Sequence, residues 1–333
     1  MRRPLATVLA LLTVAMPVAS AEAGTPSPTL QRKLARALHV PHVSPVRSAA
    51  LAVDLATGTV LYTQNGSRAL APASNEKLPV TFAALSVLGP AYRFETDVVG
   101  QGGQDGTVWT GEIVLEGAGD PTLSSAGLRN LALQVRAAGI AVTGRVRVGV
   151  AQDFSIPLAS VSSPPLSSIV RFMDRESDNF TAEMLLKQLG AIELDHGTSA
   201  AGSSVVSRVL TEAGIPMTGV RIVDGSGLSR FDRLTAGALT TLLREAWTDP
   251  VIKPVLLAAL PVAGVSGTLQ DRMRRGPAHG NVAAKTGTTN DASALSGFVR
   301  NRFAFAVVQN GHPLSYWWAR IAQDRFAQVL AAQ

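Results

Sequence analysis

The sequence contains no cysteine. This absence excludes disulfide bonds, thiolate nucleophiles and metal sites ligated by sulfur. A chain without cross-links must be stabilised by a packed core, and the composition suits one, because 46% of the residues are hydrophobic and 16% are charged. These proportions are typical of a globular protein and not of a disordered one.

Long hydrophobic runs are lacking after the N-terminal segment. There, Arg2 and Arg3 precede an apolar run over residues 5–14, and Ala19-Ser20-Ala21 matches a small-residue cleavage pattern. We therefore predict that residues 1–21 are a secretory signal peptide, with an uncleaved membrane anchor as the alternative. The apolar run is too short for a stable span, so the mature chain is expected to be exported, periplasmic or extracellular, without a membrane span.

A strong excess of one charge is also missing. The chain has 30 basic and 24 acidic residues, a formal net charge of +6, and no block of like charge. Basic and aromatic residues do not alternate in a way that would follow a nucleic acid strand. Gly117-Ala118-Gly119 runs into Pro121 without the third glycine of a dinucleotide fingerprint, and His39 and His42 lie away from any carboxylate cluster. No nucleic acid, cofactor or metal is expected.

Lysine is the scarce basic residue. It occurs at five positions, Lys33, Lys77, Lys187, Lys253 and Lys285, and the other 25 of the 30 basic residues are arginine. Arginine does not give up its proton in a protein, whereas a buried lysine can. Lysines that stand next to nucleophilic residues are therefore candidates for chemistry that arginine cannot perform.

The hydrophobic periodicity predicts an α/β (α+β) fold. A short amphipathic helix (residues 30–38), a β-hairpin (residues 48–63) and an apolar helix from Leu78 to Leu88 come first. Further helices are predicted near 166–173, 180–191, 200–213, 235–248 and 251–259, followed by strands at 282–288, 293–300 and 302–309 and a last helix at 315–330. The main domain is thus an antiparallel sheet built from both ends of the chain, with a helical region between them.

A segment of different character interrupts this domain. It contains Gly, Gln and Asp turns at 100–106, strand-like stretches at 107–115 and 144–149, and a helix around 125–138. We interpret it as a small inserted α/β subdomain over residues 95–154, so that residues 24–94 and 155–333 form the main domain.

Ser74-Asn75-Glu76-Lys77 is the first of three motifs that carry chemistry. A serine and a lysine three residues apart at a helix start lie on one face of the helix. A serine hydroxyl needs a base to take its proton. Burial and a second nearby cation, for which Lys285 is a candidate, would lower the pKa of the lysine. Alone, such a pair is more often found on a protein surface than in an active site.

Ser177-Asp178-Asn179 and Lys285-Thr286-Gly287-Thr288 are the other two motifs. The hydroxyl of Ser177 can relay a proton, and the amide of Asn179 can bind a substrate backbone. The third motif, Lys285-Thr286-Gly287-Thr288, fits a strand at the edge of a site. There, Lys285 and Thr288 can hold a substrate carboxylate, and Gly287 lets the substrate backbone approach closely. The backbone beside Thr288 and the amide of Ser74 would then serve as oxyanion donors.

Each motif is weak alone, but the three in this order are the known signature of serine β-lactamases and penicillin-binding proteins. The chain resembles in particular the D-Ala-D-Ala carboxypeptidase/endopeptidase family of class C penicillin-binding proteins, and the resemblance covers most of the mature chain. The further stretches that carry it are Pro72-Ala73-Ser74 with Lys77-Leu78, residues 117–123, Phe180 with Ala182-Glu183, residues 224–230, residues 260–264 with 267–269, and Gly280-Asn281.

The resemblance implies a transpeptidase-like fold and a serine hydrolase that acts on peptidoglycan stem peptides through an acyl-serine intermediate. It implies Ser74 as nucleophile, Lys77 as base and Ser177 as a third catalytic residue. It further implies substrate binding by Asn179, Lys285, Thr286, Gly287 and Thr288. β-Lactams would act as inhibitors, no cofactor is implied, and the location would be associated with the cell wall.

One departure from the family leaves part of the function open. Many members carry long inserted domains between the first two motifs, but only 99 residues (177 − 77 − 1) separate Lys77 from Ser177. The missing part puts the choice between carboxypeptidase and endopeptidase activity in question.

A serine β-lactamase is one alternative function, although no Glu-x-x-Leu-Asn pattern follows Asn179. A catalytically silent protein that binds wall peptides is another. The Gly-rich stretch from Asp224 to Ser229 is interpreted as a structural turn.

Overall fold

A five-stranded antiparallel sheet forms the centre of the main domain. The computed structural model describes residues 27–141, 146–150 and 155–333, so the predicted signal peptide lies outside the described residues. The sheet has the order β2-β1-β9-β8-β7, with each strand antiparallel to its neighbours. Its strands are β1 (Ser48–Asp54), β2 (Val60–Gln64), β7 (Val282–Thr288), β8 (Ala292–Val299) and β9 (Phe303–Asn310). The two ends of the chain therefore build one sheet, as the sequence predicts.

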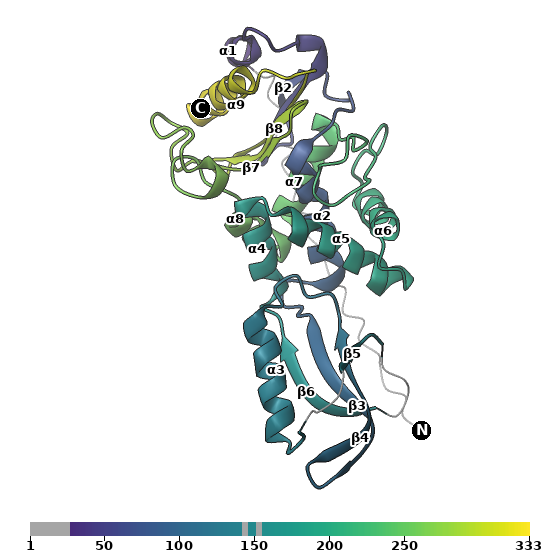
Figure 1. Cartoon of the computed structure of the whole chain (residues 1–333). Helices are drawn as coiled ribbons and strands as arrows, with labels where there is room; N and C mark the ends of the chain where they lie inside the picture. The colour runs from purple at the N-terminus through teal and green to yellow at the C-terminus, as the bar shows by residue number, and fades with distance from the viewer. Residues whose placement is uncertain (1–26, 142–145, 151–154) are drawn as a thin grey trace, which may run out of the picture.

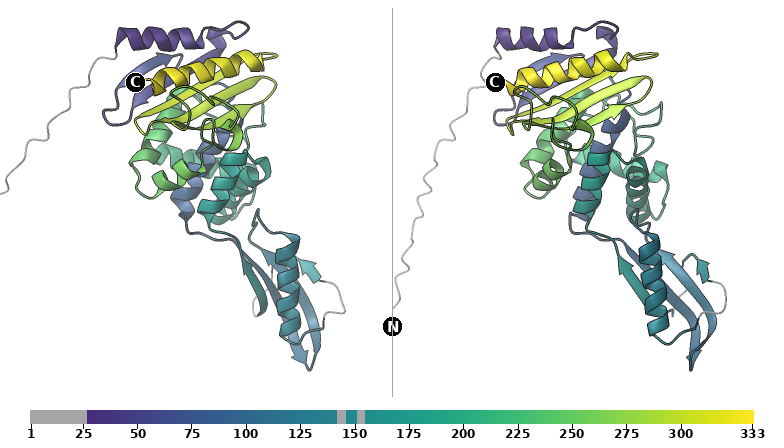
Figure 2. Two further views of the ribbon diagram at one scale, coloured as in Figure 1. Left: turned by 90° about the vertical axis from the view of Figure 1, so that its left-hand side faces the viewer. Right: turned by 60° about the vertical axis from the view of Figure 1, so that its left-hand side comes forward.

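Both faces of this sheet are covered, because its apolar side chains alternate between two cores. On one face, Phe305 and Val307 pack with α1 (Pro28–Leu38) and α9 (Tyr316–Ala331). On the other face, Ala306 and Val308 pack with the helical region. Figures 1 and 2 show α1 and α9 as an outer layer and the remaining helices of the main domain on the opposite side of the sheet.

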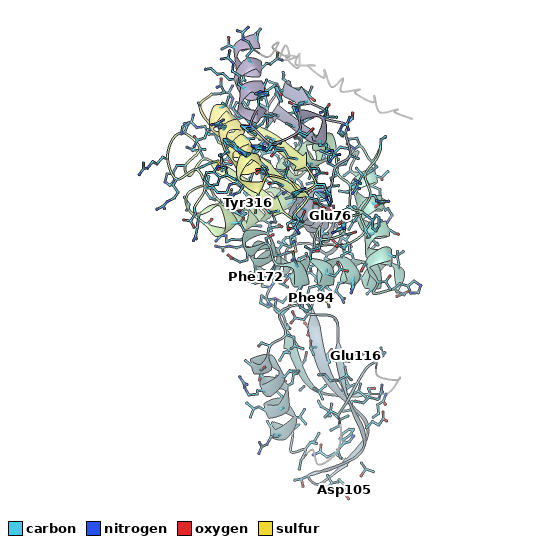
Figure 3. The ribbon with its side chains drawn as sticks, turned by 45° about the horizontal axis from the view of Figure 1, so that its top comes forward. Glu76, Phe94, Asp105, Glu116, Phe172 and Tyr316 are labelled. Carbon is cyan, nitrogen blue, oxygen red and sulfur yellow. The ribbon has the colours of Figure 1, made fainter. Side chains whose placement is uncertain are left out.

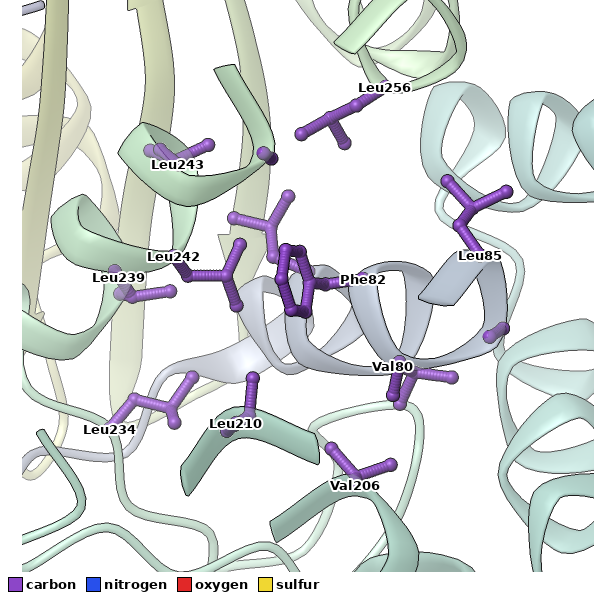
Figure 4. Close-up of a cluster of buried hydrophobic side chains, with 14 of the residues drawn as sticks. Val80, Phe82, Leu85, Val206, Leu210, Leu234, Leu239, Leu242, Leu243 and Leu256 are labelled. Atoms are coloured by element: carbon purple, nitrogen blue, oxygen red, sulfur yellow. The ribbon is translucent and has the colours of Figure 1, made fainter. Parts of the chain in front are cut away.

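Helix α2 (Lys77–Leu88) is the centre of the helical region. It is surrounded by the helices α4 (Leu166–Glu176), α5 (Asn179–Leu194), α6 (Ser199–Glu212), α7 (Ala236–Thr248) and α8 (Ile252–Ala259). Every residue of α2 from Lys77 to Leu85 is buried, which is expected for a helix that is apolar on all sides. Figure 4 shows Phe82 among leucines of the neighbouring helices. A tightly held α2 gives the residues at its N-terminus a fixed position.

The inserted segment forms a second, smaller sheet. Its strands are β3 (Glu95–Asp105), β4 (Val108–Gly117), β5 (Val146–Val148) and β6 (Ile156–Ser162), in the order β5-β4-β3-β6, and α3 (Ser125–Ala137) packs against them. The segment projects from the helical side of the main domain (Figure 1). Figure 3 shows Phe94 at the junction and Asp105 at the far end.

Two local features of this segment differ from what the sequence predicts. The turns expected over residues 100–106 are mostly strand, because β3 continues to Asp105. Gly102 and Gly111 face each other there, and a Cβ on either would lie about 2 Å from a backbone oxygen, so these glycines allow the strands to approach closely. The sequence did not predict β6, whose pairing with β3 extends the small sheet to Ser162, beyond the expected boundary at residue 154. The strand expected at 144–149 corresponds to β5, which covers Val146–Val148; residues 144 and 145 lie outside the described residues.

Candidate active site

Ser74 lies in a single 3-10 turn, Ala73–Glu76, that precedes α2. The sequence suggested a helix with a hydroxyl residue at its start, but α2 begins at Lys77 and has no side-chain cap. The Ser74 hydroxyl is therefore not used to cap the helix and is hydrogen-bonded to Lys77 instead. The turn is fixed to the sheet by Asn75, whose Nδ2 donates to the backbone oxygen of Lys285 at 3.0 Å.

Lys77 is buried directly beneath Ser74. Its Nζ donates to Ser74 Oγ at 3.2 Å, to Asn179 Oδ1 at 2.8 Å and to the backbone oxygen of Ser226 at 2.8 Å. Burial lowers the pKa of Lys77 to about 8, although nearby carboxylates, Asp174 first among them, oppose the shift. About one Lys77 in ten is then neutral at pH 7, compared with about one in 2,500 for an unperturbed lysine.

Two causes of a lowered lysine pKa are expected from the sequence, burial and a second nearby cation. Burial is the main cause for Lys77. Lys285 is buried as well, and burial together with the charge of Lys77 lowers its pKa to about 7.

Ser177 and Asn179 flank the turn between α4 and α5. Ser177 follows the last residue of α4 in a left-handed conformation, with φ of 60° and ψ of 38°. Asp178 caps α5, because its Oδ1 accepts from the backbone N–H of Thr181 at 2.7 Å. The Ser-Asp-Asn motif thus combines a structural cap at its centre with two residues that reach the lysines: Asn179 contacts Lys77, and Ser177 Oγ accepts from Lys285 Nζ at 2.9 Å.

The third motif occupies the exposed edge of the main sheet. The N–H of Ala284 points away from β8 and donates to the backbone oxygen of Pro261 at 2.9 Å. Because strand geometry repeats every two residues, the N–H groups of Thr286 and Thr288 point to the same outer side, where no further strand pairs with β7 among the described residues. A Cβ on Gly287 would lie 3.0 Å from the Ser74 nitrogen, so glycine lets β7 pass directly beside the serine.

The loop from Asp224 to Ser229 has a larger role than the structural turn that the sequence suggested. It is indeed a tight turn, in which the Asp224 carboxylate accepts from the N–H groups of Ser226, Gly227 and Ser229 at 2.6–2.9 Å. It also supplies the Ser226 oxygen that binds Lys77, and Gly227 packs so closely that a Cβ would lie 1.9 Å from the oxygen of Ala73. No local sequence pattern indicates that this turn contacts the start of α2. The only sign in the sequence that the turn belongs to the site was its match to the family over residues 224–230.

Sequence reasoning also missed three buried carboxyl groups around the lysines. Asp174 is fully buried, and burial raises its pKa against the opposing charges of Lys285 and Lys77. Burial and the charges of Asp232 and Asp224 raise the pKa of Glu76 well above its usual value. Burial and Asp224 likewise raise the pKa of Asp232 to about 7. Such shifts are common where catalytic groups are surrounded by protein.

A cavity of about 460 Å³ lies next to the turn that carries Ser74, although Ser74 itself is not part of its lining. The lining includes Ala73, Gly227 and Thr288 and the charged residues Arg230 and Asp291. It provides room for a peptide-sized ligand next to Ser74, with side chains of both charges on its walls. Among the described residues, no group of three or more His, Asp or Glu side chains is placed to hold a metal ion.

The geometry brings together three distant segments, which carry Ser74 with Lys77, Ser177 with Asn179, and Lys285 on the edge strand. Comparison with known proteins indicates what kind of site this is. The sequence matches the D-Ala-D-Ala carboxypeptidase 3 (S13) family over residues 30–151 and 135–333. The chain belongs to this family. It is a serine peptidase with the fold of the penicillin-binding proteins.

Individual relatives support this assignment. The chain is 30% identical to carboxypeptidase DacB of Mycolicibacterium smegmatis, over 94% of this chain and 86% of that protein. It is 40% identical to a D-alanyl-D-alanine carboxypeptidase of Actinomadura sp. over 52% of this chain, a match that spans 34% of the relative's length. Penicillin binding protein 4 of Haemophilus influenzae, solved in complex with a β-lactam, has a TM-score of 0.78 at 19% identity, covering 90% of this chain and 98% of the other. This last likeness shows the shared fold.

Proposed function

We propose that the protein hydrolyses the terminal D-Ala-D-Ala bond of peptidoglycan stem peptides through an acyl-enzyme on Ser74. The observation that carries the proposal is the hydrogen bond of 3.2 Å between Lys77 Nζ and Ser74 Oγ at the end of a fixed, buried helix. A serine hydroxyl becomes a nucleophile when an adjacent base removes its proton. Membership of a carboxypeptidase family supports the same reaction.

In the proposed acylation, neutral Lys77 takes the proton of Ser74, and Oγ attacks the carbonyl carbon of the penultimate D-Ala. The backbone N–H groups of Ser74 and Thr288 stabilise the negative charge on the carbonyl oxygen. This pairing is supported by the outward direction of the Thr288 N–H and by the close passage of Gly287 along the serine.

Release of the terminal D-Ala requires a proton on its nitrogen. Ser177 Oγ accepts a hydrogen bond from Lys285 Nζ, so its own O–H remains available to donate to this nitrogen. Lys285, with the hydroxyls of Thr286 and Thr288, is proposed to hold the terminal carboxylate, and Asn179 to bind the substrate backbone. In the proposed cycle, the proton that Lys77 took from Ser74 replaces the one that Ser177 gave to the nitrogen, so Lys77 is neutral again. Water then attacks the acyl-serine with Lys77 as the base, and the proton passes to Ser74 Oγ as the shortened peptide leaves.

The cavity is proposed to hold the stem peptide on the acyl side of the scissile bond. Arg230 and Asp291 on its walls can pair with ionised groups of the peptide. Because the matched family is one of carboxypeptidases, we propose carboxypeptidase action as the main activity and endopeptidase action on cross-links as an additional one. The residues proposed to carry out this reaction all lie in the main domain (residues 24–94 and 155–333), and the inserted subdomain (residues 95–154) contributes none of them.

Export follows from the proposed substrate, since peptidoglycan lies outside the cytoplasmic membrane. The N-terminal residues 1–21 are proposed to direct that export, and the mature protein to be periplasmic or extracellular and associated with the wall. In the described part of the chain, no helix has both the length and the apolar character needed to cross a membrane.

The serine β-lactamase alternative requires rapid hydrolysis of the acyl-enzyme, usually by a water that a glutamate activates. Glu183, the first glutamate after Asn179, instead accepts from the N–H of Gly225 and pairs with Lys187. No carboxylate of the described residues hydrogen-bonds to Ser74. This arrangement favours a peptidase that β-lactams inhibit.

The test is intact-mass spectrometry of the protein after brief exposure to benzylpenicillin, followed over time. We expect a persistent adduct that peptide mapping places on Ser74. Rapid loss of the adduct while hydrolysed drug accumulates would support the β-lactamase alternative. Incubation with a stem pentapeptide and with a cross-linked dimer, each followed by chromatography, then measures the two peptidase activities separately. An acylated protein that cleaves neither peptide would be a binding protein.

A further inference from the structure

The positive charge of the protein is concentrated in one part of the structure. Helices α1 and α9 and the loop over residues 271–279 contain eight basic and two acidic residues, a net charge of +6. The rest of the chain has 22 basic (30 − 8) and 22 acidic (24 − 2) residues. The formal net charge of the whole chain therefore comes from these three segments, and α1 and α9 form the outer layer of the main domain (Figure 2).

Basic side chains of the two helices meet in a groove on the surface of this layer. The groove has a volume of about 450 Å³, and Lys33 and Arg36 of α1 and Arg325 of α9 line it. All three residues are exposed, and none of their side chains has a hydrogen bond or ion pair within the described residues. Asp324, the one carboxylate among the described lining residues, is bound at 2.6 Å to the buried Arg272. The three cations of the groove are therefore free to bind an anion from outside.

The loop over residues 271–279 extends the positive surface beside α9. It is fixed there by Gln328, whose side chain accepts from the N–H of Ala278 at 3.0 Å and donates to the backbone oxygen of Arg275 at 2.8 Å. Gln328 also lines the groove, so the loop borders it. We call the following exposed residues of the three segments the basic face: Arg32, Lys33, Arg36, Arg274, Arg275 and Arg325.

The distribution of these charges and one aromatic residue indicate the kind of partner. The six cations are spread over two helices and a loop, which matches a broad anionic surface and not a single small anion. Trp317 of α9 is 68% exposed, and positions 317, 324 and 328 lie on one side of the helix because seven and eleven residues are close to whole turns. Residues 324 and 328 line the groove, so Trp317 lies on the same side. Tryptophan is favoured at membrane–water interfaces, which indicates a lipid surface.

We propose that the basic face binds a membrane that contains anionic phospholipids, with lipid phosphates in the groove and Trp317 at the level of the headgroups. Leu34 of α1 and Phe326 of α9 are fully buried in the core against the main sheet, so the helices lie on the membrane without entering its hydrocarbon. The inserted subdomain then points away from the membrane, because it projects from the opposite, helical side of the main domain (Figure 1). The proposal is independent of the reaction at Ser74.

The first test is co-sedimentation with lipid vesicles. The protein is used without residues 1–21, the form that the proposed export produces, so that the apolar run at 5–14 cannot bind lipid by itself. We expect binding to vesicles of equal parts phosphatidylglycerol and phosphatidylcholine, and at least about hundredfold weaker binding to phosphatidylcholine alone. Raising the salt from about 0.1 M to about 1 M should release the protein, because charges are then screened beyond about 3 Å. Equal affinity for the two vesicles, or no binding to either, would overturn the proposal.

Three substitutions in the groove locate the binding surface. Lys33→Gln, Arg36→Gln and Arg325→Gln, combined in one variant, should weaken binding to the anionic vesicles about a hundredfold, since each basic residue near a membrane contributes about fivefold. Tm should not change, because these exposed side chains have no partner within the described residues. If the triple variant fails to fold, Arg36→Glu alone, which changes the charge by two, should weaken binding about 25-fold. Unchanged binding in the folded variant would contradict the proposal.

The matched control removes the same charge from another part of the molecule. Arg129 and Arg136 of α3 and Arg171 of α4 are exposed, and their side chains also have no hydrogen bond or ion pair within the described residues. Their combined replacement by Gln should weaken binding to the anionic vesicles less than about fivefold, because they lie outside the basic face. Equal weakening by the two triple variants would show that only the net charge matters, and the proposal would then be wrong.

Tryptophan fluorescence separates a membrane from a soluble polyanion. With anionic vesicles, we expect the emission of the wild type to shift to shorter wavelength as Trp317 enters the headgroup region, and Trp317→Phe to lose this shift. Long-chain polyphosphate is the soluble comparison and should produce no shift. A shift that persists in Trp317→Phe would mean that another surface meets the lipid. Binding to polyphosphate but not to vesicles would assign the basic face to an anionic polymer. Either result would overturn the proposal.

Discussion

Lys285 Nζ donates a hydrogen bond of 2.9 Å to Ser177 Oγ across 108 positions of the chain. This bond joins the edge strand β7 to the turn between α4 and α5. Lys77, which binds both Ser74 and Asn179, joins the same turn to the start of α2. The two lysines therefore connect three segments into one site, and changes to any of them should have distinct, measurable effects.

Ser74→Ala should abolish acylation by benzylpenicillin and leave the fold unchanged. Within the described residues, the Ser74 side chain has one hydrogen bond, to Lys77, and caps no helix, so its loss costs little stability. Intact-mass spectrometry measures the adduct, and circular dichroism with thermal melting measures the fold. Any adduct on the folded variant would contradict the assignment of the nucleophile.

Lys77→Arg should slow acylation about a thousandfold, because arginine keeps its proton and cannot act as a base. The measurement is the rate constant of adduct formation at saturating benzylpenicillin. Lys187→Arg is the control, since Lys187 is partly exposed and pairs with Glu183 on the surface. Acylation at the wild-type rate in Lys77→Arg would show that another group takes the serine proton.

Gly287→Ala should reduce acylation about tenfold or more without unfolding the protein. The new Cβ would lie 2.8 Å from the oxygen of Pro72 and 3.0 Å from the nitrogen of Ser74, which must move β7 away from the proposed oxyanion donors. Gly103→Ala is the control, because nothing lies within 4 Å of the Cβ that it adds. Equal acylation rates in the two variants would mean that β7 does not need its close contact with Ser74.

Glu76→Gln should stabilise the protein increasingly as the pH rises above about 4.5. Burial raises the pKa of Glu76, so the folded state keeps a proton that the unfolded state releases above its ordinary pKa. The wild type therefore loses about 1.4 kcal/mol per pH unit from this residue until the raised pKa is reached. Gln carries no titrating proton and avoids this loss.

Urea unfolding at several pH values measures this difference between Glu76→Gln and the wild type. Comparing the two proteins separates Glu76 from Asp174 and Asp232, whose pKa values are also raised. Glu112→Gln, at an exposed carboxylate, is the control and should show no such trend. A constant difference between the Glu76 variant and the wild type across the pH range would mean that Glu76 is ionised in the folded protein.

Several features of the fold could be predicted from the sequence because local patterns determine them. The apolar run from Leu78 to Leu88 requires a buried helix, and the strand patterns after Val282 match β7 to β9. The three motifs could be identified because their residue types and order are specific. Strand β6 was not predicted, because its short sequence carries no clear strand pattern and it forms a strand by pairing with β3.

The sequence alone determined which residues can do chemistry: one serine three positions before a lysine, a second lysine before Thr-Gly-Thr, and no cysteine to compete with them. Only the tertiary structure decided how their protons are distributed. Burial lowers the pKa of Lys77, and Asp174 acts on both lysines because α4 packs against α2. Asp232 and Asp224 raise the pKa of Glu76 because the loop after Ile222 packs against the turn before α2. The pKa of a group depends on the water and charges around it in space, and a residue's sequence neighbours do not specify these.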